Sequence, residues 1–210
     1  MWNSRLTILA VALMLAGGTA QGALIFTDLP TFLAELQPGY YLEDYSTYSW
    51  GSQGQTMNFS QGGFSYSASA PLDLWINTAI GNSLSTVHAD DAISFTFTSG
   101  NVTAVGGYFF PTDVSEQLIV GDVVLTLSDG TVQVLNNPGT ASFVGFITTG
   151  GVLITSLTVD APDTIEYSWP TVDDFYVGAA GDAIPEPSTF LLLTIGAGGL
   201  LLMRRKLRRQ

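Results

Sequence analysis

Two pairs of acidic residues stand near opposite ends of the central part of the chain, each inside a segment of strand-like sequence. Glu43 and Asp44 come early, and Asp173 and Asp174 come late. If the first and last strands run side by side, as in a jelly roll, the four carboxylates form a cage of hard oxygen ligands, which Ca²⁺ prefers. We therefore predict a calcium site at these four residues; the alternative is that they are edge-strand acids facing water.

Three of the four tryptophans form a second candidate site. Trp50, Trp75 and Trp169 lie in or beside breaks rich in Gly, Ser and Pro, which favours exposure. An exposed indole stacks on a sugar ring because it buries apolar surface while keeping a polar edge in water. We predict that these residues bind carbohydrate; the alternative is that they pack in the core.

Catalytic constellations are scarce. The chain has no Cys and one His, His88, which precedes Asp90 and Asp91. This composition excludes thiol nucleophiles and metal sites built on Cys or on several His, and no Gly-x-Ser-x-Gly elbow occurs. We predict no catalytic residues and no enzymatic activity; the less favoured alternative is a secreted hydrolase with two carboxylates roughly 5–10 Å apart across a cleft.

The charge distribution is strongly polarised. The formal net charge is −12, yet residues 23–184 contain no Lys and no Arg, and the six basic residues lie at the two ends of the chain. An acidic domain of this kind repels polyanions and attracts cations. Nucleic acid is therefore excluded as a partner, and a cation is the natural counter-charge for a half-buried carboxylate.

The secondary-structure elements that must hold these candidate residues in place are mostly strands. Leu29, Phe32, Leu33 and Leu36 have helical spacing and predict one short helix, capped by Thr27 or Asp28 and ended by Pro38-Gly39. After it, short alternating runs separated by Gly, Ser and Thr predict an all-β fold, a β-sandwich of jelly-roll type. Asp129-Gly130 between two such runs predicts a hairpin. The runs are 41–45, 63–68, 93–98, 102–110, 123–127, 132–134, 142–148, 152–159 and 171–177.

The N-terminus has the three parts of a secretory signal peptide. Arg5 supplies the positive region, residues 6–16 form a short apolar run, and Ala20-Gln21-Gly22 ends it with small residues. We predict cleavage between Gly22 and Ala23 by signal peptidase. The domains are then 1–22 (signal peptide), 23–177 (acidic β-sandwich), 178–184 (Gly/Ala-rich linker) and 185–210 (C-terminal tail).

The tail combines a Pro-Glu-Pro motif at Pro185, Glu186 and Pro187 with an apolar run over 188–203. As a helix, residues 190–203 span roughly 21 Å, short of the ~30 Å hydrocarbon core, so we expect the helix to begin near Pro187. By the positive-inside rule the basic end stays cytoplasmic and the acidic domain lies outside. That end contains Arg204, Arg205, Lys206, Arg208 and Arg209.

This layout resembles the PEP-CTERM sorting tail, which in its family is processed by a membrane enzyme called exosortase. The central domain resembles the jelly-roll or lectin-like modules that often precede such tails, through residues 41–45, Val144-Gly145-Phe146 and 172–177. The resemblance implies an inner-membrane-anchored precursor in a Gram-negative bacterium, then a surface or exopolysaccharide-matrix protein. We predict a structural or adhesive role, with Ca²⁺ as the one candidate cofactor; the alternative is a carbohydrate-binding module for extracellular polysaccharide.

Overall fold

The computed structural model describes residues 22–89, 91–162 and 167–181. The predicted signal peptide before Gly22, the sorting motif, the apolar helix and the basic end lie outside these residues. No helix in the described part of the chain has the length and apolar character needed to cross a membrane.

The described residues form twelve strands and one short helix. The predicted all-β class is confirmed. In chain order the elements are β1 Leu24–Phe26, α1 Leu29–Ala34, β2 Tyr41–Glu43, β3 Gly51–Gln61, β4 Phe64–Asn77, β5 Ser83–Thr86, β6 Ile93–Phe97, β7 Ala104–Thr112, β8 Val123–Leu127, β9 Val132–Leu135, β10 Phe143–Ile147, β11 Ser156–Asp160 and β12 Trp169–Gly178.

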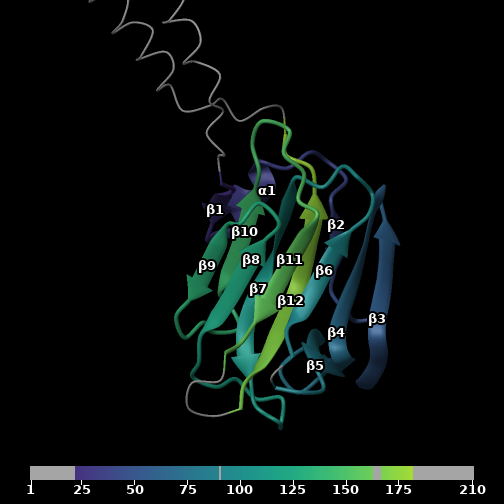
Figure 1. Cartoon of the computed structure of the whole chain (residues 1–210), viewed down its shortest axis with the longest axis vertical. Coiled ribbons are helices and arrows are strands. Elements are labelled where there is room, and N and C mark those ends of the chain that lie inside the picture. The colour runs from purple at the N-terminus through teal and green to yellow at the C-terminus, as the bar shows by residue number, and fades with distance from the viewer. Residues whose placement is uncertain (1–21, 90, 163–166, 182–210) are drawn as a thin grey trace, which may run out of the picture.

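All named strands belong to one curled sheet in which every pair is antiparallel. The strand order is β1-β10-β7-β12-β5-β4-β6-β11-β8-β9, with β2 paired to β12 and β3 paired to β4. The sheet folds over on itself, so that one limb lies across the other as in a sandwich (Figure 1). The short strand β5 connects the limbs, because it pairs with both β4 and β12.

The core lies between the two limbs. Phe175 of β12 stacks on Phe95 of β6 with ring centroids 4.2 Å apart, and Tyr66 of β4 meets Phe175 edge-on at 5.6 Å. In β6 the alternation predicted from the sequence places Ile93, Phe95 and Phe97 inside the core. These rings supply most of the large apolar surface that holds the limbs together.

The predicted helix and its Asp28 cap are confirmed, but the helix ends at Ala34 with Glu35 as its C-cap, earlier than the predicted stop at Pro38-Gly39. The Asp28 carboxylate accepts the Thr31 backbone N–H at 3.0 Å, which caps the first turn. Phe32 of the helix is fully buried over β10. A Cβ atom on Gly145 would approach Cε2 of the Phe32 ring to 2.8 Å, so only glycine fits beneath the helix here.

The predicted hairpin at Asp129-Gly130 is also confirmed, since it joins β8 to β9. Gly130 takes a φ of 87°, and Leu127 N–H donates to the Thr131 carbonyl. The sequence did not reveal β1, β3 or β5, and the predicted strand 152–159 begins only at Ser156.

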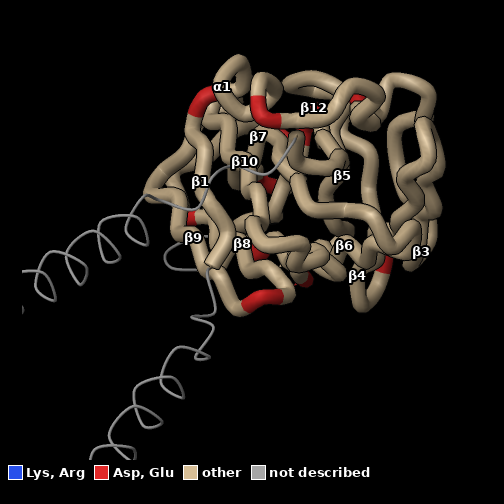
Figure 2. The backbone as a smooth tube through the Cα atoms, turned by 90° about the horizontal axis from the view of Figure 1, so that it is seen from above, with Lys and Arg blue, Asp and Glu red and all other residues tan. Residues whose placement is uncertain are grey.

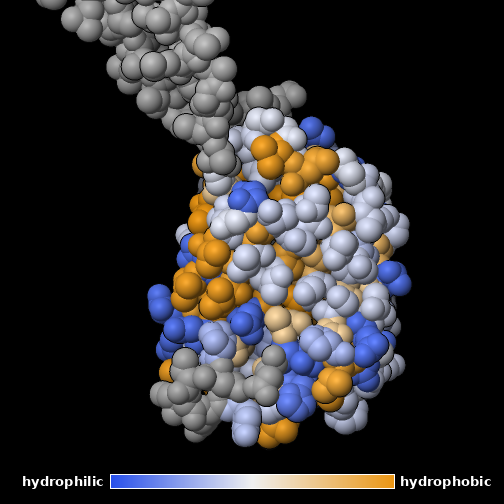
Figure 3. Space-filling view, viewed as in Figure 1, coloured by the Kyte–Doolittle hydropathy of each residue, from blue (hydrophilic) through white to orange (hydrophobic). Residues whose placement is uncertain are grey.

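The outer edges of the sheet are β1 and β9. Ala23 N–H donates to the Asp129 carboxylate and to the Thr131 hydroxyl, both at 3.1 Å, so the start of β1 lies against the β8–β9 turn. Figure 3 shows apolar side chains gathered along the side of the molecule where these two strands lie. The exposed apolar residues of the two edge strands are Leu24, Ile25, Val132 and Val134.

The predicted linker over 178–184 begins too early. Gly178 is the last residue of β12, and the next residues remain docked: Gln37 N–H donates to the Ala179 carbonyl at 2.9 Å, and Ala180 N–H donates to the Thr103 hydroxyl at 2.7 Å. Gly181 N–H reaches the Glu35 carbonyl. The folded domain therefore extends to Gly181, and three residues separate it from Pro185.

Strand β12 runs from one end of the domain to the other. It begins at Trp169, near β5, and ends at Gly178, near α1 and the point where the chain leaves the described domain (Figure 1). Ten strand residues at about 3.3 Å each place these ends roughly 30 Å apart.

Candidate functional site

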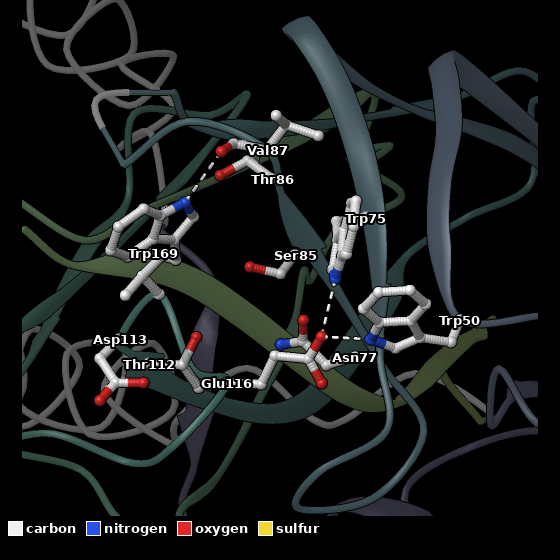
Figure 4. A pocket seen from close by; sticks show the side chains of 11 residues that line it. Trp50, Trp75, Asn77, Ser85, Thr86, Val87, Thr112, Asp113, Glu116 and Trp169 are labelled. Atoms are coloured by element: carbon white, nitrogen blue, oxygen red, sulfur yellow. Dashed lines mark hydrogen bonds between the residues drawn. The ribbon is translucent and has the colours of Figure 1, made fainter.

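The three tryptophans predicted to bind a ligand converge on one pocket. Trp50 precedes β3, Trp75 lies on β4 and Trp169 opens β12, yet all three line the same cavity of about 270 Å³. Figure 4 shows Trp169 on one side and Trp50 and Trp75 on the other. The remaining lining residues are Asn77, Ser85, Thr86, Val87, Thr112, Asp113, Val114 and Glu116.

The indoles are held at fixed angles. The rings of Trp50 and Trp75 meet edge-on, with centroids 5.0 Å apart and planes at 81°. Trp169 donates its Nε1–H to the Val87 carbonyl at 3.2 Å. Trp50 is 60% exposed, so a large indole surface remains open to a ligand at the mouth of the pocket.

Glu116 is the residue that organises the tryptophan pair. Its Oε1 accepts the Nε1–H groups of Trp50 at 2.6 Å and Trp75 at 2.9 Å. Its Oε2 accepts the backbone N–H groups of Thr78 at 2.9 Å and Ala79 at 3.2 Å. One carboxylate therefore joins four donors from two segments that are far from it in sequence.

The Glu116 backbone supports this arrangement at some cost. Its φ is 61°, a left-handed conformation that is unfavourable for a residue with a Cβ. The surrounding loop is held by Asp113, whose Oδ1 accepts the N–H groups of Ser115 at 2.8 Å and Gln117 at 2.9 Å. The loop thus presents Glu116 to the tryptophans in one conformation.

Electrostatics favour an ionised Glu116. Partial burial acts to raise the pKa of this carboxyl, but the hydrogen bonds from Trp75, Thr78, Trp50 and Ala79 together outweigh burial and lower the pKa. In its ionised form Glu116 accepts hydrogen bonds and holds the indoles of Trp50 and Trp75 in place. A lowered pKa is the opposite of what a general acid needs.

The pocket also contains an unpartnered donor. Asn77, at the end of β4, is 2% exposed, and its side-chain nitrogen has no hydrogen-bond partner. Asn77 pairs across the sheet with Ser83, whose hydroxyl is likewise buried without a partner. Two adjacent unsatisfied polar groups at this end of the sheet are a costly arrangement unless something else binds there.

The sequence indicated the tryptophans but not the polar residues around them. The sequence placed all three tryptophans in or beside breaks; in the structure Trp75 lies within the long strand β4, Trp169 is the first residue of β12, and Trp50 lies just before β3. Glu116, Asp113 and Asn77 gave no signal, because their roles come from tertiary contacts. A polar loop sequence, Asp113-Val114-Ser115-Glu116, was the one available hint.

The four predicted calcium ligands do not form one group. Strands β2 and β12 do pair, with Glu43 opposite Phe175, as the jelly-roll argument required. However, Glu43 is 8% exposed and turned inward, where it accepts hydrogen bonds from the Tyr41 hydroxyl and from Tyr45 N–H. Among the described residues no three His, Cys, Asp or Glu side chains are placed to hold a metal ion.

The other three carboxylates repel one another. Burial, followed by the charges of Asp174 and Asp44, raises the pKa of Asp173 to about 6. Burial and then the charge of Asp44 raise the pKa of Asp174. Asp174 also sits at a bulge of β12 with a φ of 44°. Ionisation of Asp173 and Asp174 therefore opposes folding, whereas hydrogen bonds from Ser46 lower the pKa of Asp44.

Lys and Arg take no part in these contacts, because the described residues contain none (Figure 2). N–H and O–H groups therefore take the place of Lys and Arg as carboxylate partners in this domain, as they do at Asp28 and Asp113. His88, the residue considered for catalysis, does not line the tryptophan pocket.

The fold and the pocket define a class: an acidic all-β domain with a tryptophan-lined surface pocket, joined to a C-terminal tail. Residues 183–209 match the family model described as the PEP-CTERM protein-sorting motif. The chain therefore ends in a PEP-CTERM sorting motif, which confirms the resemblance seen in the sequence and implies an exported, membrane-anchored precursor that exosortase processes.

Comparison with curated proteins and with solved structures gives no further assignment. No curated protein matches the chain. A crystal structure of an exo-beta-1,3-galactanase from Phanerochaete chrysosporium with galactose is similar at 14% identity and a TM-score of 0.30, over 66% of this chain. The chain spans 29% of that structure, and a similarity at this level says nothing about binding or catalysis here.

Replacing Glu116 by Gln tests the carboxylate support. Glu116→Gln keeps the size but leaves one acceptor oxygen for four donors, so we expect a loss of about 1 kcal/mol in unfolding free energy, below the roughly 1.5–3 kcal/mol of a buried hydrogen bond to a charged group because the site is partly exposed. Trp fluorescence and near-UV circular dichroism should change with it. Glu35→Gln, the same exchange at a carboxyl group outside the pocket, is the matched control.

The pH dependence of this effect has a defined sign. The pKa of Glu116 is lower in the folded state than in the unfolded state. Its stabilising contribution is therefore fully present above the ordinary pKa of a glutamate, and it is lost as the pH falls from there through the lowered pKa of the folded state. The stability gap between the wild type and Glu116→Gln should therefore close in acid. A gap that is constant from pH 7 to pH 3 would contradict this role.

Replacing Asp173 by Asn tests the repelling cluster. Because the folded pKa is about 6, the wild type loses stability as pH rises from about 4 to 6, and Asp173→Asn should not. Above pH 6 the variant should be more stable by roughly 1 kcal/mol, a value reduced for solvent screening. Thermal melts across pH measure this, and equal melting temperatures at pH 7 would refute it.

Equal midpoints in EDTA and in excess Ca²⁺ would count against the calcium hypothesis.

Proposed function

We propose that this protein is a non-enzymatic, exported surface protein that adheres to extracellular glycan through the pocket formed by Trp50, Trp75 and Trp169. The observation that carries the proposal is the convergence of three indoles from distant segments on one open cavity. Indoles that served only the core would be buried, whereas Trp50 is 60% exposed. Apolar ring surface beside polar groups is the chemistry that binds a sugar ring.

The position of the pocket supports an adhesive role. The pocket lies at the β5 end of the domain, and the chain leaves the domain for the sorting motif at the α1 end (Figure 1). While the C-terminal tail anchors the precursor in the membrane, the pocket faces away from the attachment point. A binding site at the far end is accessible to polymer outside the cell.

The contacts favour binding over hydrolysis. The two carboxylates that line the pocket, Asp113 and Glu116, are already engaged by N–H groups of the protein. Glu116 has a lowered pKa and four donors, so it serves as the support of the indole pair. A secreted hydrolase remains the less favoured alternative.

Tryptophan substitution tests the glycan site. Trp50→Ala and Trp169→Ala should each weaken retention on the cell's own extracted exopolysaccharide by on the order of tenfold, because indoles at the centre of an interface contribute most of its energy. Affinity electrophoresis in gels containing the polymer measures retention. Tyr167→Ala is the matched control, since Tyr167 is 72% exposed and lies outside the pocket. If the control and the pocket variants are retained like the wild type, the proposal fails.

The sorting motif predicts processing that can be measured separately. Intact mass of the mature protein should show that residues 204–210 are gone, and changing Pro185, Glu186 and Pro187 together to Ala should leave them in place in the membrane fraction. Asp182→Ala, outside the motif, is the control and should be processed normally. A mature wild-type protein that retains the basic end would reduce the tail to a simple anchor.

A further inference from the structure

We propose that the tryptophan pocket selects an uncharged, hydroxyl-bearing sugar residue and excludes acidic sugars, and that Asn77 is the residue that determines this specificity. The proposal rests on the glycan-binding function above and names its ligand class. It combines three observations: the unpartnered amide of Asn77, the carboxylates in the pocket wall, and the absence of Lys and Arg from the described residues.

The donor in the pocket is the side-chain amide of Asn77. The Asn77 nitrogen is buried at a residue that is 2% exposed, lines the pocket and has no protein partner. A buried N–H₂ group left unpaired is costly, so the site is built for an acceptor oxygen that arrives with a ligand. Figure 4 shows Asn77 between Trp169 on one side and the Trp50–Trp75 pair on the other, where a bound ring would lie.

The charge of the pocket wall restricts which acceptor groups a ligand can bring. An acidic sugar also carries acceptor oxygens, but the pocket wall contains Asp113 and the ionised Glu116. No Lys or Arg of the described residues can neutralise a ligand carboxylate (Figure 2). An anion in this pocket would be repelled and left without a counter-charge. A neutral hydroxyl avoids both penalties.

A neutral hydroxyl also matches the hydrogen-bonding groups of the pocket. A sugar hydroxyl accepts and donates at once. It can accept from Asn77 while donating to an oxygen of the wall, such as those of Thr112, Ser85 or Asp113. A permanently charged amine would fit the carboxylates and the indoles, but it has no acceptor for Asn77. The unpaired amide therefore favours a neutral polyol over a cation.

The size of the site agrees with one sugar residue. A cavity of about 270 Å³ lies just below the usual range for small-molecule pockets. It suits a single ring held between indoles, with the rest of a polymer passing outside over the exposed Trp50.

Matched pairs of neutral and acidic oligosaccharides test this selectivity in the folded domain, residues 22–181 still joined to its tail in detergent. The probes are β-1,4-linked manno-oligosaccharides with β-1,4-linked oligomannuronate, and cello-oligosaccharides with β-1,4-linked oligoglucuronate, since the members of each pair share their linkage and differ only in oxidation at C6 of each residue. Calorimetry at low salt should show one neutral series binding at least tenfold more tightly than its acidic partner. The ratio should shrink as added salt screens the repulsion.

Two variants then test Asn77. Asn77→Leu, similar in shape, should weaken binding of the neutral probe about threefold to tenfold, the value of one hydrogen bond, without lowering the melting temperature. Asn77→Asp replaces the donor by a further anion and should weaken binding more at pH 7 than at pH 4. Asn58→Leu, on the exposed side of β3, is the control and should bind like the wild type.

The outcomes separate the two levels of the argument. If acidic and neutral partners bind equally, the selectivity is overturned while glycan binding stands. If Asn77→Leu binds like the wild type, Asn77 is not the determinant. If no oligosaccharide binds and exopolysaccharide retention does not depend on the tryptophans, the proposed function fails and this inference fails with it.

Discussion

The structure depends on the way strand β12 is held between the two limbs of the sheet. Its backbone pairs with β7 along most of its length and with β2 and β5 on the other side, while Phe175 stacks on Phe95 across the core. The same strand begins with Trp169 in the pocket and ends at Gly178, before the docked segment that leads to the tail. Loss of its packing would therefore disturb the core, the tryptophan pocket and the exit of the chain together.

A second constraint is the absence of basic side chains from the described residues. Carboxylates in most domains find Lys or Arg; here they accept from N–H and O–H groups instead, and this need explains several local structures. Asp28 caps α1, Asp113 closes a loop, and Glu116 draws together two indoles. At Asp173 one such donor, the Asp174 N–H at 2.8 Å, does not offset burial and the neighbouring charges, which raise the pKa. The same deficit leaves the pocket wall acidic, with Asp113 and Glu116 and no basic side chain among the described residues, and the proposed preference for neutral sugars rests on this feature of composition.

Periodicity and turn chemistry were enough to predict the all-β class, helix α1 and the Asp129-Gly130 hairpin, because these depend on local pattern. Strands β3 and β5 were missed because Gly, Ser and Gln make them read as breaks; they are strands because β4 and β12 pair with them. The grouping of three tryptophans was predicted from residue type, but Glu116 and Asn77 were not. Their roles arise where distant segments meet, and Glu43 shows the converse, since an acid expected to bind calcium is satisfied by Tyr41 and Tyr45 inside the core.

Under the proposed adhesive function, strand β12 would carry the load between the bound polymer and the tethered tail. A polymer bound at Trp169 pulls on one end of β12, and the anchored tail holds the other. Because both forces act on the same extended strand, the load runs along the β12 backbone, and the β12–β7 hydrogen bonds, which lie perpendicular to the strand axis, are not opened one by one. The bulge at Asp173 and Asp174 interrupts that ladder, but pairing resumes from Tyr176 to Gly178 and continues through the docked residues to Gly181. An adhesive protein needs this property: the ligand and the anchor are joined by one continuous strand, and the rest of the sheet resists its displacement.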